Sequence, residues 1–231
     1  MTQEMRRDFV KHSFYKASPE WRRLSSTAKE ESKSQFAEVL AEFSDRIDIG
    51  SYSLVGTRAD VDFMLWEISP TIDSINGLQA QLNRTNLGGY LEMPHSYLSM
   101  TRPSPYVDDH KHEGQEGTAA SMRILGRKFL FIYPFVKTHE WYQLPLGERQ
   151  QLMSEHFVIG HKYPSVKIST AYSFGLDDQE FVLGFESDDA GGFLDLVEAL
   201  RSSKARPYTE RDTPIFTCLA KPIEACLDDL G

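Results

Sequence analysis

The sequence uses one order of secondary structure twice, and this repetition constrains the fold more than any other feature. In the first half, apolar periodicity predicts a strand, a helix, a hairpin, a helix and a strand, at residues 9–15, 19–43, 51–68, 70–84 and 97–101. The second half repeats that order at residues 128–136, 146–161, 167–186, 189–202 and 215–219. This order defines the ferredoxin-like βαββαβ unit, which leaves one face of its sheet uncovered. We therefore predict an α+β fold of two ferredoxin-like βαββαβ units whose sheets pack against each other.

Details of the pattern place the boundaries of the two units. Ser18 before Pro19 is a plausible N-cap for the first long helix. We expect the first unit to span residues 1–102, a linker loop residues 103–126, and the second unit residues 127–231. Loops of this length are uncommon unless they are functional or disordered. His110 and His112 in the linker resemble a metal-binding pair, but they lie among charged residues without a third ligand, so a solvated loop is the favoured interpretation.

Composition and charge exclude several classes of function. The formal net charge is -9 and no basic stripe is interleaved with aromatic residues, which argues against a nucleic-acid partner. No apolar run approaches the roughly 18–20 residues that a membrane span needs, and the N-terminus lacks the apolar core of a signal peptide. Cys218 and Cys226 are not in a CxxC arrangement and are interpreted as free thiols. We therefore expect a cytoplasmic protein that does not associate with membranes.

His156 is the most informative single residue. It falls on one face of the predicted helix at residues 146–161, together with Leu152, Met153 and Ile159. A histidine on an apolar face is either a core residue with its polar atoms satisfied or an axial ligand that offers a nitrogen to a haem iron. The residues around His156 decide between these two interpretations.

Several motifs in a fixed order surround His156. They are Tyr133-Pro134-Phe135-Val136-Lys137, Glu140-Trp141-Tyr142-Gln143-Leu144-Pro145, Glu148-Arg149-Gln150, Gly160-His161-Lys162-Tyr163 and Gly175-Leu176-Asp177-Asp178, with Gly50-Ser51-Tyr52 in the first half. In this order the sequence resembles the chlorite dismutase-like superfamily of haem proteins, and within it the coproheme decarboxylase branch. The resemblance covers nearly the whole chain. It implies a dimeric α+β barrel, assembly as a homopentamer, and haem binding in the second unit only.

The resemblance also implies a reaction. Members of the branch convert iron coproporphyrin III (coproheme) to haem b with hydrogen peroxide as oxidant, and two propionates lose carbon dioxide to become vinyl groups. This is the last step of a coproporphyrin-dependent route to haem, so the resemblance makes a ferrochelatase a candidate donor of the substrate.

By the same resemblance, His156 is the proximal iron ligand and Tyr133 is the tyrosine that becomes a radical and takes a hydrogen atom from a propionate. Lys137 follows four residues later and lies on the same face of a regular strand, where it would hold a propionate and supply a proton. The alternatives are a core tyrosine with a bonded hydroxyl and a solvated lysine. Trp141 corresponds to a tryptophan near the haem, although packing alone explains it equally well.

Further candidates come from looser correspondences. Arg123 and Arg127 lie where the family places propionate-binding arginines, and Thr213 lies near a position that can donate a hydroxyl to a propionate. Chlorite dismutases carry an arginine about 13 residues after the proximal histidine, over the distal face of the haem. Here that position is Ile168 or Ser169, which argues against chlorite chemistry. The branch's glutamine is also missing, so the distal proton acceptor stays open, including a contribution from His110 or His112.

Coproheme decarboxylation is therefore the leading hypothesis. The alternatives are a haem-binding peroxidase or haem carrier of the same fold, and an oligomeric interaction protein without haem in which His156 is a core residue. A carrier has no use for the pairing of Tyr133 with Lys137, and a protein without haem would give no Soret band with coproheme.

Overall fold

The computed structural model describes residues 7–106 and 122–231, and it contains the predicted order of elements in both halves. The first half runs through β1 (Phe9–Ala17), η1 (Trp21–Arg23), α1 (Ser26–Phe43), β2 (Asp48–Ser53), β3 (Phe63–Ser69), α2 (Ile72–Leu82), η2 (Leu87–Tyr90) and β4 (Leu91–Met100). The second half runs through β5 (Phe129–Lys137), α3 (His139–Gln143), α4 (Leu146–Gly160), β6 (Lys167–Tyr172), β7 (Phe181–Ser187), α5 (Ala190–Arg201), η4 (Arg206–Tyr208), β8 (Thr209–Arg211), β9 (Phe216–Ala220) and α6 (Ile223–Asp228).

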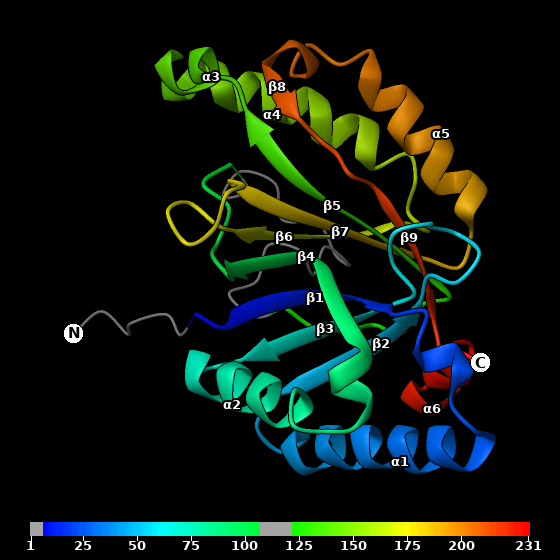
Figure 1. Cartoon of the computed structure of the whole chain (residues 1–231). Helices are drawn as coiled ribbons and strands as arrows, with labels where there is room; N and C mark the ends of the chain where they lie inside the picture. The colour runs from blue at the N-terminus through cyan, green and yellow to red at the C-terminus, as the bar shows by residue number, and fades with distance from the viewer. Residues whose placement is uncertain (1–6, 107–121) are drawn as a thin grey trace.

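The strands form one closed barrel, as expected for the fold class. Their order is β7-β6-β4-β1-β3-β2-β9-β5-β8, and a further β7–β5 pairing closes the ring, with β8 attached to the end of β5. The two halves meet along both edges, where β4 pairs with β6 at Met100–Tyr172 and β2 pairs with β9 at Tyr52–Ala220. Helices α1 and α2 cover one side of the barrel, and α4 and α5 cover the other (Figure 1). Closure leaves the main sheet without a free edge.

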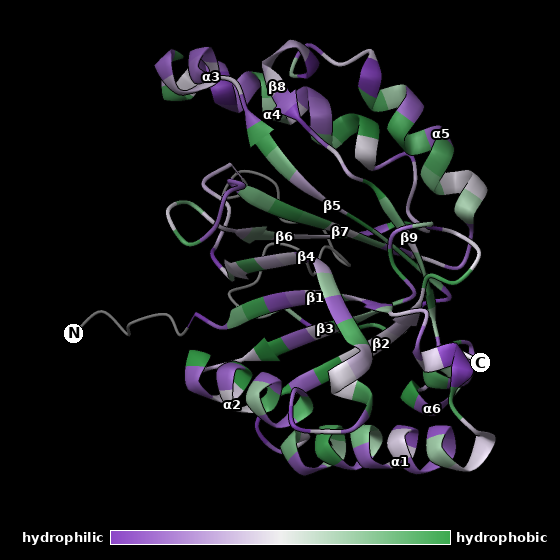
Figure 2. Cartoon of the chain, viewed as in Figure 1, coloured by the Kyte–Doolittle hydropathy of each residue, from purple (hydrophilic) through white to green (hydrophobic). Residues whose placement is uncertain are grey.

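Strand alternation divides the apolar residues into an interior and two outer layers. On β5, Leu130 and Ile132 point into the barrel, where they pack with Val10 and Phe14 of β1. The alternate residues of β5 face α5, and Phe131 stacks on Phe193 with ring centroids 3.9 Å apart. Hydrophobic residues accordingly run through the strands of both halves in Figure 2. One barrel core and two helix-covered layers hold the fold together.

The first long helix begins later than the sequence suggested. Helix α1 starts at Ser26, and the N-cap is Ser25, whose side chain accepts a hydrogen bond from the backbone nitrogen of Ala28. Ser18 is therefore not the cap. The predicted start at Pro19 is wrong because the short turn η1 buries Trp21 in the outer core and Leu24 then takes an extended conformation. The burial of one tryptophan interrupts an otherwise helical stretch.

Several short elements and the length of one strand were also missed. Strand β4 begins at Leu91, six residues before the predicted start at residue 97, and α3, β8 and α6 were not predicted. Helix α6 returns to the first half, where Cys226, Leu227 and Leu230 join the outer core between the sheet and α1. Both cysteines are free and buried. His110 and His112 lie outside the described residues, and none of the described helices combines the length and apolar character that crossing a bilayer requires.

Candidate functional site

A large cavity lies between α4 and the outer face of the second half's sheet. Its volume is about 960 Å³, near the upper end of the roughly 300–1,000 Å³ of small-molecule sites. The cavity exists because α4 stands away from the sheet: no residue of α4 is buried, whereas α1 buries five residues at the matching place in the first half. Aromatic and aliphatic side chains fill that space in the first half.

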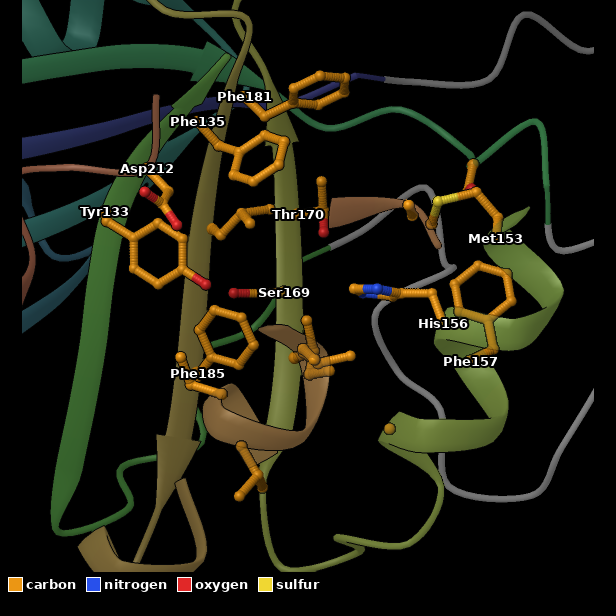
Figure 3. Close-up of a pocket in the computed structure, with 18 of the residues that line it drawn as sticks. Tyr133, Phe135, Met153, His156, Phe157, Ser169, Thr170, Phe181, Phe185 and Asp212 are labelled. Atoms are coloured by element: carbon orange, nitrogen blue, oxygen red, sulfur yellow. The ribbon is translucent and has the colours of Figure 1, made fainter. Parts of the chain in front are cut away.

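Helix α4 turns His156 toward this cavity (Figure 3). Met153, Phe157 and Gly160 line the cavity with it, whereas Leu152 and Ile159, which we predicted on the same face, do not. The imidazole of His156 makes no hydrogen bond to any described residue, and its ring lies 6.3 Å from that of Phe157. Burial and the charge of Lys137 lower the pKa of His156 to about 4. At neutral pH the ring is therefore uncharged and keeps a lone pair available for a metal.

Strand β5 supplies the opposite side of the cavity. Tyr133, Phe135 and Lys137 occupy alternate positions and line the cavity together, as the period of two predicts. The ring of Tyr133 stacks on Phe185 at 5.5 Å, and its hydroxyl points inward in Figure 3 without a hydrogen bond to any described residue. Burial and the nearby carboxylate of Asp212 raise the pKa of Tyr133, which keeps it a neutral phenol.

Lys137 and Trp141 form a pair at the end of β5. Trp141 is 2% exposed and lines the cavity from α3. The Nζ of Lys137 lies 4.2 Å from the centre of the Trp141 ring and 5.3 Å from that of Phe135, which are cation–π distances. No carboxylate lies within ion-pair distance of this Nζ among the described residues. Burial is the main reason that the pKa of Lys137 falls to about 8, with Arg206 lowering it further.

Ile168 and Ser169 lie on β6 and both line the cavity. The Ser169 hydroxyl donates a hydrogen bond to the backbone oxygen of Gly184 at 3.3 Å. In Figure 3 Ser169 lies across the cavity from His156. Strand β6 contains no arginine, so it supplies no guanidinium to this side of the cavity.

The cavity wall is rich in positive charge. Six of the described lining residues are cationic and two are anionic: Arg102, Arg123, Lys137, Lys167, Arg201 and Arg206 against Glu186 and Asp212. Arg123 is exposed, and Arg102 lies over the ring of Tyr172 at 5.5 Å. Asp212 receives ion pairs from Arg201 at 2.6 Å and from Arg206 at 2.5 Å. Such a wall favours a ligand that carries several carboxylates.

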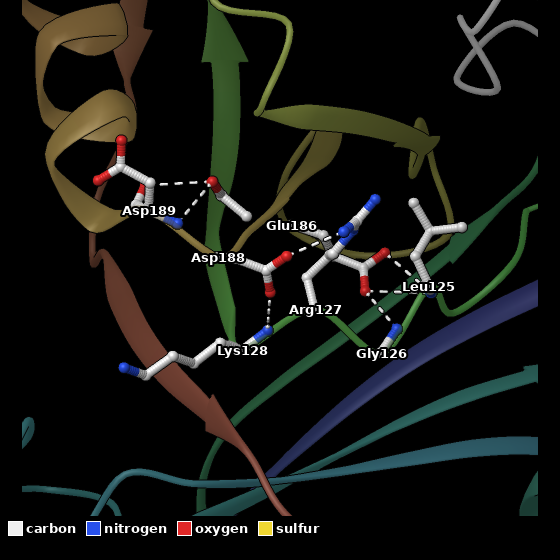
Figure 4. A network of polar contacts seen from close by, with 8 residues as sticks. Leu125, Gly126, Arg127, Lys128, Glu186, Asp188 and Asp189 are labelled. Carbon is white, nitrogen blue, oxygen red and sulfur yellow. Dashed lines mark hydrogen bonds and ion pairs between the residues drawn. The ribbon is translucent and has the colours of Figure 1, made fainter.

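The structure does not bring Arg127 and Thr213 to the cavity. Glu186 accepts hydrogen bonds from the backbone nitrogens of Leu125 and Gly126, and Asp188 accepts one from that of Lys128 (Figure 4). This anchoring turns Arg127 outward, where it forms an exposed ion pair with Asp188 at 2.9 Å. Thr213 is exposed as well, and its neighbour Asp212 lines the cavity instead.

Sequence reasoning missed the arginines and the aspartate that surround Tyr133. Arg201 ends α5, Arg206 lies in η4, and Asp212 follows β8, so their positions depend on how three elements meet. The pairing of β8 with the end of β5, at Val136–Arg211, brings them together. No motif or periodicity in the sequence marks such a meeting point. Within the described ranges there is also no group of three or more metal-binding side chains.

Known proteins share both the sequence pattern and the fold. Residues 29–221 match the chlorite dismutase family. The coproheme decarboxylase of Mycolicibacterium smegmatis is 32% identical over 169 residues, which cover 73% of this chain and 71% of the relative. The structure of chlorite dismutase from Candidatus Nitrospira defluvii in complex with imidazole superposes with a TM-score of 0.87 at 22% identity, covering 96% of this chain and 94% of that one. A haem-binding protein from Thermus thermophilus gives a TM-score of 0.82 at 23% identity, with the same coverage. This chain belongs to the chlorite dismutase family.

Proposed function

We propose that this protein catalyses the peroxide-dependent oxidative decarboxylation of two propionates of coproheme, which yields haem b. One observation carries the proposal: a neutral imidazole, His156, with no hydrogen bond to any described residue, lies across the cavity from a buried phenol, Tyr133, and most of the charged residues that line the cavity are cationic. The named activity of the relative from Mycolicibacterium smegmatis supports the same conclusion.

The residues of the cavity fit an iron porphyrin. A porphyrin gives the iron four nitrogens, so a single histidine completes five-coordination and leaves the sixth position open. His156 is the residue that would hold the iron. The porphyrin's carboxylates match the excess of cationic residues in the wall, and the aromatic side chains Tyr133, Trp141, Phe157 and Phe185 offer apolar surface to the macrocycle.

The bound iron porphyrin, together with hydrogen peroxide, supplies the oxidising equivalents for the reaction. Each propionate loses one hydrogen atom from the carbon next to the ring and one carbon dioxide. Two electrons leave in total, one with the hydrogen atom and one more as the carbon dioxide is released. One peroxide and one proton are consumed for each vinyl group, and two waters form. We propose that Tyr133 first gives one electron and one proton to the oxidant and becomes a phenoxyl radical, which then takes the hydrogen atom from the propionate and returns to the phenol. Its hydroxyl is not engaged by a described residue, and its raised pKa keeps the proton on the phenol before the oxidation.

Lys137 is proposed to hold a propionate and to supply the proton. With its pKa at about 8, the ammonium is charged at neutral pH and can still release its proton at little cost. Trp141 would keep the ammonium in place through the cation–π contact. Arg123 is proposed as a further carboxylate anchor. Ile168 and Ser169 would face the open side of the iron.

Purified protein mixed with coproheme and hydrogen peroxide, followed by mass spectrometry of the porphyrin, tests this function. We expect two successive mass losses in the wild type. Tyr133→Phe should bind coproheme with an unchanged Soret band but lose the mass change. Vinyl-bearing product at the normal rate from Tyr133→Phe would remove Tyr133 from the chemistry.

A haem carrier or peroxidase of the same fold is the second candidate. It is favoured only if the wild type binds coproheme and oxidises a general peroxidase substrate while leaving the propionates intact. Assembly as a homopentamer, a cytoplasmic location and a ferrochelatase donor stay predictions of the family resemblance, and size-exclusion chromatography with light scattering tests the first of them.

A further inference from the structure

Asp212 is one of the two acids among the described residues of a cavity wall that otherwise suits an acidic ligand, and it is the one that forms ion pairs with arginines. It follows β8, where the last strand of the second half is interrupted before β9 begins at Phe216. The matching strand of the first half, β4, runs without a break from Leu91 to Met100. The interruption directs Asp212 to the cavity, beside Tyr133 in Figure 3.

Asp212 holds two arginines with a single oxygen. Nη1 of Arg201 and Nη1 of Arg206 both contact Oδ2, at 2.6 and 2.5 Å, while Oδ1 has no hydrogen bond to a described residue. The side chain of Asp212 is only 16% exposed, whereas those of Arg201 and Arg206 are 41% and 35% exposed. Each guanidinium has five N–H donors, so both arginines keep donors for a second carboxylate.

Asp212 and the two arginines also act electrostatically on Tyr133 and Lys137, the residues that are proposed to act on a propionate. Arg206 lowers the pKa of Lys137, and Asp212 raises the pKa of Tyr133, so the influence of both charges reaches these two residues. With Asp212 in place, the local group of two arginines and one aspartate carries a net charge of +1, which matches one carboxylate.

We propose that Asp212 is a specificity-determining residue that competes with a substrate carboxylate for Arg201 and Arg206. When the porphyrin has a propionate beside Tyr133, that propionate and Asp212 share the two arginines. When the propionate has become a vinyl group, the arginines pair with Asp212 alone. Asp212 thereby limits how tightly the tetracarboxylate is held and takes the arginines back once the carboxylate is gone. This inference rests on the proposed function, since it assumes that a propionate lies beside Tyr133.

Iron-free porphyrins test the idea without the His156–iron bond. Coproporphyrin III carries four carboxylates and protoporphyrin IX carries two, and quenching of tryptophan fluorescence reports their binding because Trp141 lines the cavity. We expect Asp212→Asn to raise the preference for coproporphyrin III over protoporphyrin IX about tenfold, which corresponds to about 1.4 kcal/mol. Asp212→Glu keeps the charge and should retain the wild-type preference.

Asp188→Asn is the matched control, because Asp188 also pairs with an arginine, Arg127, but outside the cavity. Its preference should equal that of the wild type. A preference in Asp212→Asn that stays within twofold of the wild type, or that falls, would overturn the proposal and leave Asp212 as a structural tie between α5 and β8. If Asp212→Asn does not fold by circular dichroism, Asp212→Ser gives the same comparison. Failure of the wild type to bind coproporphyrin III at all would also overturn this proposal, whereas failure to convert coproheme with peroxide would refute the proposed function.

Discussion

Replacing Lys137 with methionine should stabilise the protein without ligand while weakening its binding of porphyrin carboxylates. Lys137 carries its charge in a partly buried position with aromatic rings but no ion-pair partner among the described residues. Its pKa falls from 10.5 to about 8, and each unit corresponds to about 1.4 kcal/mol. Burying the charge therefore costs the folded state at most about 3 kcal/mol. Partial exposure and the cation–π contacts reduce this figure to about 1–2 kcal/mol.

The effect has a defined pH dependence. Below about pH 8 both the folded and the unfolded chain bind the proton, so the folded state carries the full cost. Between about pH 8 and pH 10.5 the unfolded chain binds more protons than the folded one, and the free energy of unfolding rises with pH. The advantage of Lys137→Met should therefore be largest at pH 7 and shrink by more than half by about pH 9.5.

Thermal unfolding without ligand measures this difference. For a chain of this size, 1 kcal/mol shifts Tm by about 2–4 °C, so Lys137→Met should unfold about 2–8 °C higher than the wild type at pH 7. Lys128→Met is the control, since Lys128 lies 5.0 Å from the centre of the Phe129 ring but is exposed, and its Tm should hardly move. A lower Tm for Lys137→Met at pH 7, or a difference that does not change with pH, would refute the reasoning. Porphyrin affinity should move the opposite way, because a bound carboxylate stabilises the ammonium.

Two further predictions address iron binding and backbone packing. His156→Ala should abolish the spectrum of histidine-bound coproheme. It should change the free energy of unfolding of the ligand-free protein by less than about 1 kcal/mol, because the imidazole has no hydrogen-bond partner among the described residues. A retained five-coordinate spectrum would show that another residue holds the iron. Gly88→Ala should destabilise the first half by more than about 2 kcal/mol, because its Cβ would collide with the backbone oxygen of Leu82. The neighbouring Gly89→Ala has nothing within 4 Å of its Cβ and should be nearly neutral in urea unfolding, so equal effects at the two positions would contradict the packing described.

The candidate site was partly predictable because strand alternation is a local property. Tyr133 and Lys137 lie on one face of β5 as their spacing required, and both line the cavity with His156. The expected positions of Arg127 and Thr213 failed for a different reason. Both lie in loops, and for Arg127 hydrogen bonds from neighbouring backbone nitrogens to the distant residues Glu186 and Asp188 decide which way the side chain turns. Spacing along the chain carries no information about those partners.

The sequence by itself determined the repeated βαββαβ order, the two hairpins and the family to which the chain belongs, because periodicity and short motifs depend on residues that are close together in the chain. Only the tertiary structure decided that side chains fill the space between helix and sheet in the first half, whereas the matching space in the second half is a cavity. That difference arises because α1 packs its apolar face onto the sheet while α4 stands away from it. The same packing gathered Arg201, Arg206 and Asp212 beside Tyr133, since their positions depend on the meeting of separate elements in space.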